Sequence, residues 1–253
     1  MQGKYYQTDL VKPIVNKLGN VAFAADDVLF DWTAFEIPKG TALLEDIVFT
    51  MPGTNAVAGN THDIQLFFAK SIDGVDPPSL GDSNAAMNVI SSTAARPYII
   101  CYSLLDASRQ MDQGDSLVGW NLGRRDSATN GAYCGVAALL SGDLKDDTRQ
   151  GYQTIWVAGV AQGALDFGTD CLIAGTHTED DLTIVVDGTD ADDLFAIGEE
   201  LIAFHDNGSA EIVIGTVTAV AADLITVASA PAITDDHEVC LKSPVTLRFN
   251  LSY

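Results

Sequence analysis

Positively charged side chains are scarce in this sequence. Its 253 residues include 13 lysines and arginines against 35 aspartates and glutamates, which gives a net charge of −22 and a pI near 4.1. A nucleic-acid-binding protein neutralises backbone phosphates with Lys and Arg, so this balance argues against DNA or RNA as a partner. An anionic membrane surface would repel the chain in the same way.

Cysteine is also rare. The four cysteines, Cys101, Cys134, Cys171 and Cys240, form no CxxC pair and match no zinc-finger spacing. Cys101 and Cys134 lie in apolar segments, where a free thiol packs as a small hydrophobic group. We expect all four thiols to be reduced, as in a protein made in a reducing cytosol. Cys171 and Cys240 are the pair most at risk of forming a disulfide.

Long apolar runs of the membrane-spanning kind are missing too. The best candidate, residues 212–233, is interrupted by Asp223 and punctuated by threonines and Pro231, so two strands explain it better than a helix. The first 20 residues have no apolar core region, and we expect no secretory signal. Since 47% of the residues are hydrophobic, the chain can still form a dry core.

Short apolar runs at a period of two predict an all-β protein. Residues 42–70 contain two such runs around a Gly- and Asn-rich loop, and they predict two long antiparallel strands at the centre of a β-sandwich. The last residues alternate apolar and polar side chains, as a half-buried strand does. Eight strands, the number in a jelly roll, are expected at 21–31, 42–51, 63–69, 98–105, 117–122, 132–140, 154–161 and 243–253. One short helix is expected at 84–88.

The composition divides the chain into three segments. Residues 1–20 read as a polar N-terminal arm, and residues 21–168 with 243–253 as a jelly-roll-like antiparallel β-sandwich. Residues 169–242 contain 16 acidic residues and one basic residue, and their turn-bounded apolar runs predict a small acidic β-barrel or β-ribbon. Because the terminal strand follows this segment, we interpret it as an insertion into the sandwich. Its predicted strands are 182–186, 200–204, 212–220 and 224–228.

Residues 114–117 spell GDSL, the nucleophile motif of a hydrolase family. That chemistry needs an α/β fold and a later Asp-x-x-His, but Thr234 stands three residues before His237 and no βαβ alternation is present. We therefore expect a polar turn here. The sequence predicts no catalytic residue and no cofactor.

Two sets of side chains raise the question of a metal ion. The carboxylates that could collect calcium are Asp187, Asp190, Asp192 and Asp193. The histidines that could suggest zinc are His177, His205 and His237. The carboxylates lack the glycine and terminal glutamate of an EF-hand, and the histidines are spaced by about thirty residues, so we favour a solvated acidic turn and no zinc site.

Aromatic and basic side chains indicate where a partner could bind. The candidate contacts are Tyr5 and Tyr6 in the arm, and Trp120, Arg124 and Arg125 after a predicted strand. Adjacent arginines can pair with the carboxylates of a partner. A surface salt bridge, which stabilises a protein little, is the alternative interpretation.

Several segments together resemble a family of tailed-bacteriophage virion proteins, the jelly-roll capsid decoration or accessory head proteins. The segments are ALLEDIVFT, DIQLFFAKS, DSNAAMN, YIICYSLLD, QTIWVAGVAQGALDFGT and SPVTLRFNLSY, which cover most of residues 18–168 and 243–253. Residues 169–242 do not fit that pattern and are similar instead to small barrels with a Gly-Thr-Val-Thr-x-Val strand, which occur in phage structural proteins.

This resemblance implies a function in binding. It implies a non-enzymatic virion structural protein, made in the host cytoplasm, that decorates or cements a phage capsid and forms homo-oligomers. Its partners would be the major capsid protein or neighbouring virion subunits, with no nucleic acid and no membrane. The alternative is a tail, fibre or baseplate-associated adhesion module that contacts the host surface.

Overall fold

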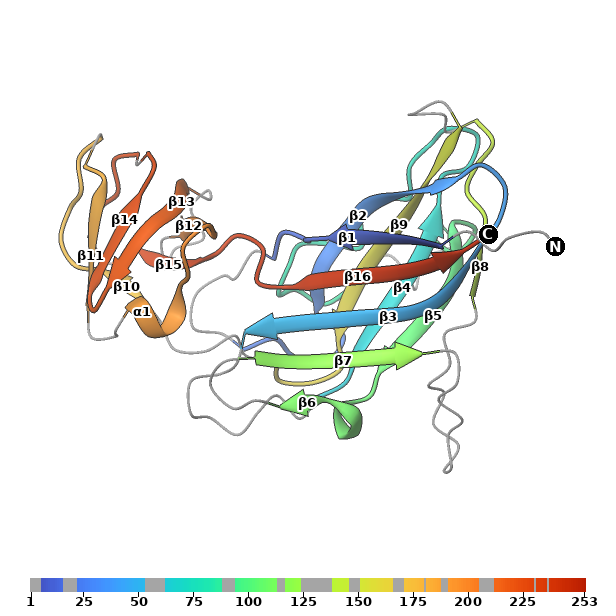
Figure 1. The fold of residues 1–253 in the computed structure, drawn as a ribbon, viewed down its shortest axis with the longest axis horizontal. Coiled ribbons are helices and arrows are strands. Elements are labelled where there is room, and N and C mark those ends of the chain that lie inside the picture. The colour runs from blue at the N-terminus through green and yellow to red at the C-terminus, as the bar shows by residue number, and fades with distance from the viewer. Residues whose placement is uncertain are drawn as a thin grey trace.

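Two antiparallel sheets and a closed barrel make up the structure, a computed structural model (Figure 1). It describes residues 6–15, 22–52, 62–87, 94–112, 117–123, 138–145, 151–165, 171–179, 181–187, 191–204, 212–229, 231–235 and 237–253. The barrel lies beyond one end of the sheets, and the C-terminus lies at the other end. The prediction of an all-β antiparallel sandwich is confirmed.

The first sheet runs in the order β1-β16-β3-β7-β6, and β8 pairs with the start of β3. Its strands are β1 (Tyr6–Val11), β3 (Ala42–Pro52), β6 (Met111–Asp112), β7 (Leu117–Gly123), β8 (Ala138–Leu140) and β16 (Thr246–Ser252). The short 3-10 helix η1 (Ala107–Arg109) precedes β6. The first and last described strands therefore pair with each other.

The second sheet runs in the order β2-β9-β4-β5. Its strands are β2 (Val28–Pro38), β4 (Ile64–Lys70), β5 (Ile99–Leu105) and β9 (Tyr152–Ala161). Except between β4 and β5, each step along the chain among the eight strands β1, β2, β3, β4, β5, β7, β9 and β16 crosses from one sheet to the other. Each sheet thus depends on strands that are distant in sequence.

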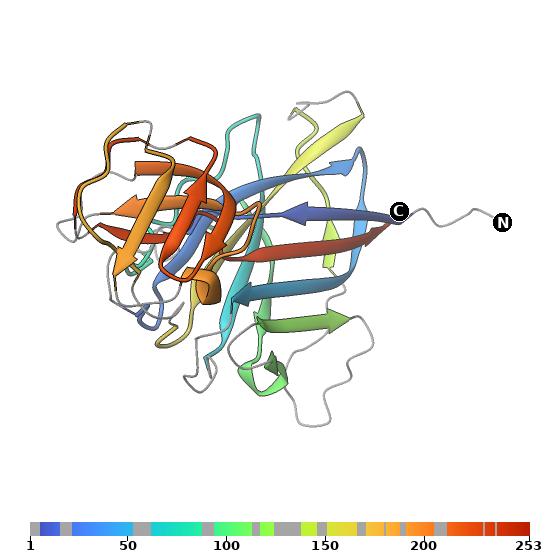
Figure 2. The same cartoon turned by 60° about the vertical axis from the view of Figure 1, so that its left-hand side comes forward.

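Between β9 and β16 the chain forms a closed barrel in the order β10-β11-β14-β13-β12-β15 (Figure 2). Its elements are β10 (Leu172–Ile173), β11 (Thr183–Asp187), α1 (Ala191–Leu194), β12 (Glu200–Phe204), β13 (Ile212–Ala221), β14 (Leu224–Val227) and β15 (Glu238–Leu241). Closure removes unpaired strand edges, which suits a barrel this small.

A β-bulge in β3 explains how this strand keeps one apolar face. Before the bulge the buried side chains are Ala42 and Leu44, and after it they are Ile47, Phe49 and Met51. The register against β16 shifts at this point, because Leu251 pairs with Leu44 and Asn250 with Asp46. The extra residue restores the apolar side chains to the core side, where simple alternation would have turned them to solvent.

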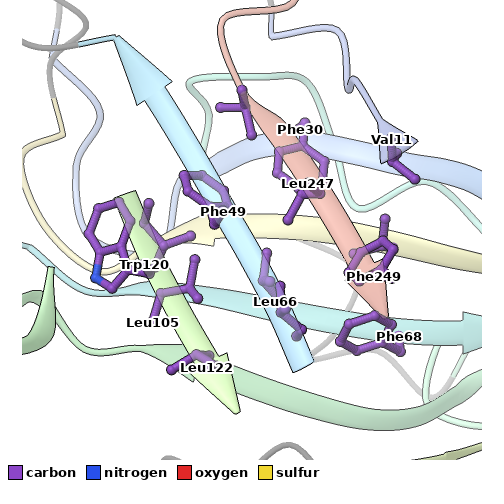
Figure 3. Packing of buried hydrophobic residues seen from close by; sticks show 14 of the residues in the cluster. Val11, Phe30, Phe49, Leu66, Phe68, Leu105, Trp120, Leu122, Leu247 and Phe249 are labelled. Atoms are coloured by element: carbon purple, nitrogen blue, oxygen red, sulfur yellow. The ribbon is translucent and has the colours of Figure 1, made fainter. Parts of the chain in front are cut away.

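Aromatic rings fill the space between the sheets. Phe249 of β16 stacks on Phe35 of β2 at a centroid distance of 4.6 Å, and it meets Phe68 of β4 edge-on at 5.6 Å. Figure 3 shows Phe249 beside Phe68, and Phe49 close to Trp120. Face-to-face burial of this kind, about 25 cal/mol per Å² of apolar surface, is the main force that holds two sheets together.

The barrel has a separate core. Its buried cluster contains only residues between Cys171 and Val239, with Ile184, Leu201 and Ile225 fully buried. The sandwich cluster contains none of these residues. The two sets of apolar side chains therefore stabilise two different parts of the chain.

Part of the 72–87 connection lies on the outer face of the second sheet. Leu80 is buried there with Val28, Phe67 and Val160. Trp32 Nε1 donates to the carbonyl of Pro78 at 2.8 Å. This connection gives the outer face of the sheet a small apolar layer of its own.

Several predicted elements need correction. Residues 6–11, assigned to a polar arm, form β1 and pair with β16. The two strands of residues 42–70 do not pair with each other, because β3 and β4 belong to facing sheets. The strand predicted at 21–31 begins at Val28 and continues to Pro38.

The remaining predictions agree in part. Residues 84–87 form a turn and an isolated bridge rather than a helix. The four strands expected between 182 and 228 are present, and β10 and β15 were not predicted. Most of the strand expected at 132–140 lies outside the described residues. No helix within the described ranges is long and apolar enough to cross a membrane.

Candidate functional site

Trp120 is a core residue and not a surface contact. Its side chain is 2% exposed, and it meets the Phe49 ring edge-on at 5.4 Å. Its Nε1 donates to the carbonyl of Asp106 at 3.0 Å, which satisfies the polar edge of the ring. The prediction that Trp120 binds a partner is therefore wrong. Figure 3 shows it on β7 near Leu105.

The other predicted contacts cannot be placed as side chains. Tyr5, Arg124 and Arg125 lie outside the described residues. Tyr6 begins β1, where its backbone pairs with Ser252, and its side chain is outside the description. The binding assignment of these four residues stays a prediction.

The proposed calcium ligands lie around the end of β11 and the start of α1. Asp187 is the last residue of β11 and is exposed, and Asp192 is exposed in α1. Asp190 and the side chain of Asp193 lie outside the described residues. Among the side chains that are described, no group of three or more His, Cys, Asp or Glu is placed to hold a metal ion.

His177 fixes a loop of the barrel. Its Nε2 accepts the N–H of Val185 at 3.4 Å, and its Nδ1 lies 3.5 Å from Asp181 Oδ2. The His177 backbone pairs with Ile233 in both directions. The side chain is 5% exposed, so this buried imidazole holds the 174–182 connection against β11.

His237 plays a similar part on the neighbouring connection. Its Nδ1 lies 2.8 Å from Thr234 Oγ1, and its carbonyl accepts the N–H of Ile173. His205 lies outside the described residues. His177 and His237 are thus bound to protein groups of the barrel, and their chemical role is to hold its loops in place.

Cys101, Cys171 and Cys240 are not in disulfide bonds. Burial raises the pKa of Cys101 to about 12. Burial, with a smaller effect of the nearby Glu238 carboxylate, raises the pKa of Cys171 to about 12. The nucleophilic form of a cysteine is the thiolate, so these two thiols are unreactive near neutral pH. Cys134 lies outside the described residues.

Of the GDSL motif at residues 114–117, only the leucine lies in the described part of the chain. Gly114, Asp115 and Ser116 lie outside the described residues, and Leu117 begins β7. β7 is an antiparallel strand between β3 and β6. The hydrolases with this motif place their serine in an α/β fold, and the sheets around β7 are antiparallel.

The main feature that the sequence analysis missed is an exposed, uncharged strand. Tyr102 on β5 is 70% exposed, although the pattern of this segment only predicted a strand. β5 ends its sheet in the order β2-β9-β4-β5. The signal that could have revealed it is the run of nine residues from 97 to 105 without a charged side chain.

Comparison with known proteins gave no relative. No protein-family model, no curated protein and no solved structure matched the chain.

Proposed function

We propose that this chain is a non-enzymatic virion structural protein that decorates or cements the capsid of a tailed phage. The observation that supports it best is the order of the sandwich strands, β1-β16-β3-β7 facing β2-β9-β4-β5. We interpret this order as a jelly roll, an architecture that occurs in viral capsid and lectin domains. Fold alone does not define function, so the proposal also depends on the sequence segments that resemble accessory head proteins.

The distribution of charge between the barrel and the sandwich supports a role in capsid decoration. Residues 169–242 carry 16 acidic residues and one basic residue, and most of the chain's Lys and Arg lie elsewhere. Dense copies on a particle would repel one another through these barrels and remain soluble. In this proposal the sandwich docks on the major capsid protein or a neighbouring subunit, and the barrel points outward.

A second candidate function is supported by the barrel alone. The barrel has its own core and lies beyond the end of the sheets (Figure 1). A tail, fibre or baseplate-associated protein could present such a module to a host surface. Its position in the virion separates this function from capsid decoration.

Binding to empty capsids tests the proposal. Purified protein is mixed with capsids assembled without it and sedimented, and we expect a saturable number of copies to sediment with the capsids. A protein without the barrel, in which residues 171–241 are replaced by a short Gly-Ser linker, is the matched control and is expected to bind as well. Protein that stays in the supernatant with capsids but sediments with tails supports the second function instead.

A further inference from the structure

The outer edge of β5 is unpaired in the part of the chain that the structure describes. β5 pairs with β4 over the register from Ile64–Leu105 to Ala69–Ile99. No other strand within the described residues pairs with it. Such an edge presents unpaired backbone N–H and C=O groups, which can accept another strand.

The edges of the first sheet have the usual protection against strand addition. β1 contains Asp9 and is followed by Lys12 and Pro13. β6 at the other edge is two residues long. Charged side chains, a proline and a short edge strand all disfavour pairing with another chain.

The outer edge of β2 is covered by the chain itself. The N–H of Val28 donates to the carbonyl of Ala85, and the N–H of Asn84 donates to the carbonyl of Val28, both at 2.9 Å. Further along, Gln7 Nε2 donates to the carbonyl of Glu36 at 3.2 Å. The strand then ends at Pro38.

Within the described residues, none of these protective features is present at β5. Its seven residues, IICYSLL, include no charge and no proline. Tyr102 is 70% exposed and pairs with Phe67 of β4, which is 8% exposed. A long, uncharged edge strand with an exposed aromatic ring is a surface that a soluble protein normally covers with a partner.

We propose that the edge of β5 pairs antiparallel with β5 of a second copy of this chain. A two-fold axis at this edge would join the two four-stranded sheets into one continuous eight-stranded sheet. The outward Tyr102 side chains of both copies would lie over the joined strands. This inference depends on β5 and its flanks and not on the proposed function in a virion.

The charges around β5 favour a second copy in this orientation. Residues 97–105 are uncharged, with Arg96 exposed before them and Asp106 after them. Antiparallel pairing brings Arg96 of each copy near Asp106 of the other, whereas parallel pairing would bring like charges together. Each copy has a net charge of −22, so an uncharged edge is where two copies can approach at least electrostatic cost.

The carboxyl group of Asp106 carries the negative charge that pairing with Arg96 of a second copy requires. Hydrogen bonds from the hydroxyl and the N–H of Ser108 lower the pKa of its carboxyl group. Both bonds are short, at 2.6 and 2.8 Å to Oδ1. The carboxylate therefore remains ionised at neutral pH and is held close to the end of β5.

Sedimentation of wild-type protein and two variants tests the inference. We expect the wild type to dimerise with increasing concentration. Tyr102→Lys places a positive charge on β5 of both copies and should weaken dimerisation by about tenfold or more. The matched control is Leu10→Lys on the protected edge strand β1, where the native side chain is 55% exposed, and it should dimerise like the wild type. Circular dichroism verifies that each variant is folded.

Hydrogen exchange of the wild type gives a second, variant-free measurement. Amides of residues 99–105 should exchange more slowly at a concentration that favours the dimer than at one that favours the monomer, while β1 amides should not change. A wild type that is monomeric at every concentration overturns the inference. So does a dimer that Tyr102→Lys leaves intact, or one in which 99–105 gain no protection.

Discussion

The ring of Phe249 stacks on the ring of Phe35 at a centroid distance of 4.6 Å and an interplanar angle of 28°. Phe35 lies on β2, near the start of the chain, and Phe249 lies on β16, after the barrel. This contact joins the two sheets across the core. The sandwich is therefore completed by a strand that follows the barrel in sequence.

The stability of the sandwich should depend strongly on this contact. Phe249→Ala removes a fully buried ring that also meets Phe68, and we expect a loss of about 3–5 kcal/mol in the free energy of unfolding. Arg248→Ala on the same strand changes an exposed side chain and should cost no more than about 0.5 kcal/mol. Urea unfolding measures both, and equal effects would contradict the assigned core.

The barrel should be removable. Its chain enters and leaves through neighbouring strands, since the N–H of Val239 donates to the carbonyl of Cys171 at 2.7 Å. A short Gly-Ser linker in place of residues 171–241 then joins two nearby points. Each halving of a connection lowers its closure cost by about 0.6 kcal/mol, so this shortening lowers it by roughly 2 kcal/mol and favours the native state. The truncated protein loses 15 acidic and no basic side chains. It should keep its β signal in circular dichroism and remain soluble.

An insoluble truncated protein, or one with a much lower melting temperature, would contradict the separation of the two cores. The isolated barrel, residues 171–241, is the complementary sample. Its own cluster of buried side chains predicts a cooperative thermal transition.

The thiols predict how stability varies at alkaline pH. The pKa values of Cys101 and Cys171 rise from 9.0 to about 12 on folding, so above pH 9 the unfolded chain releases protons that the native chain keeps. Stability must then fall as the pH rises from about 9 to about 12, by at most about 1.4 kcal/mol per pH unit for each thiol. Cys171→Ala should show a shallower fall than the wild type in urea unfolding at pH 8.5, 9.5 and 10.5. If the stability of Cys171→Ala and of the wild type fell equally with pH, the burial of Cys171 would be contradicted.

The same thiols should be reduced. Titration of denatured protein without reductant should report all four cysteines, because burial and a raised pKa make thiols such as Cys101 and Cys171 slow to oxidise. In the native protein, Cys101 and Cys171 should react slowly. A count of two or fewer after denaturation would mean that disulfides are present.

Removal of metal ions should leave the fold unchanged. A chelator is expected to shift the melting temperature by no more than about two degrees, since Asp187 and Asp192 are exposed to solvent and belong to no metal-holding group among the described residues. A large decrease that calcium reverses and magnesium does not would restore the calcium site. Asp187→Asn should then abolish the calcium effect, and the exposed Asp82→Asn, outside the barrel, should not.

Strand positions could be predicted where one face is apolar, but strand partners could not. Leu247, Phe249 and Leu251 alternate with polar residues, and β16 is placed as this pattern predicts. The same pattern in β3 and β4 suggested a pair, because periodicity reports which face is buried and not which sheet a strand joins. Pairing depends on crossings between sheets that connect residues far apart in sequence.

β1 shows the opposite case. Its residues, YQTDLV, alternate weakly and read as a polar arm. Its pairing with β16 supplies backbone hydrogen bonds that the side-chain pattern does not reveal. Polar edge strands are therefore harder to predict than central ones.

The residues that contact a partner are harder to predict from the sequence than the strands are. Trp120 follows the pattern of a strand, but which side of the strand faces the core depends on the partner sheet. In the structure Trp120 packs against Phe49, so a residue that was predicted to contact a partner belongs to the core. Tyr102, on a strand with the same apolar character, became exposed because β5 lies at an edge.

Labelling of whole virions tests the central proposal most directly. If the proposal is correct, gold-conjugated antibodies against this chain should mark the surface of phage heads in electron micrographs. Quantitative mass spectrometry of the same virions should give on the order of hundreds of copies per particle, as expected for a protein that follows the symmetry of a capsid. Label on the tail with tens of copies or fewer, or no label on the virion, would contradict capsid decoration.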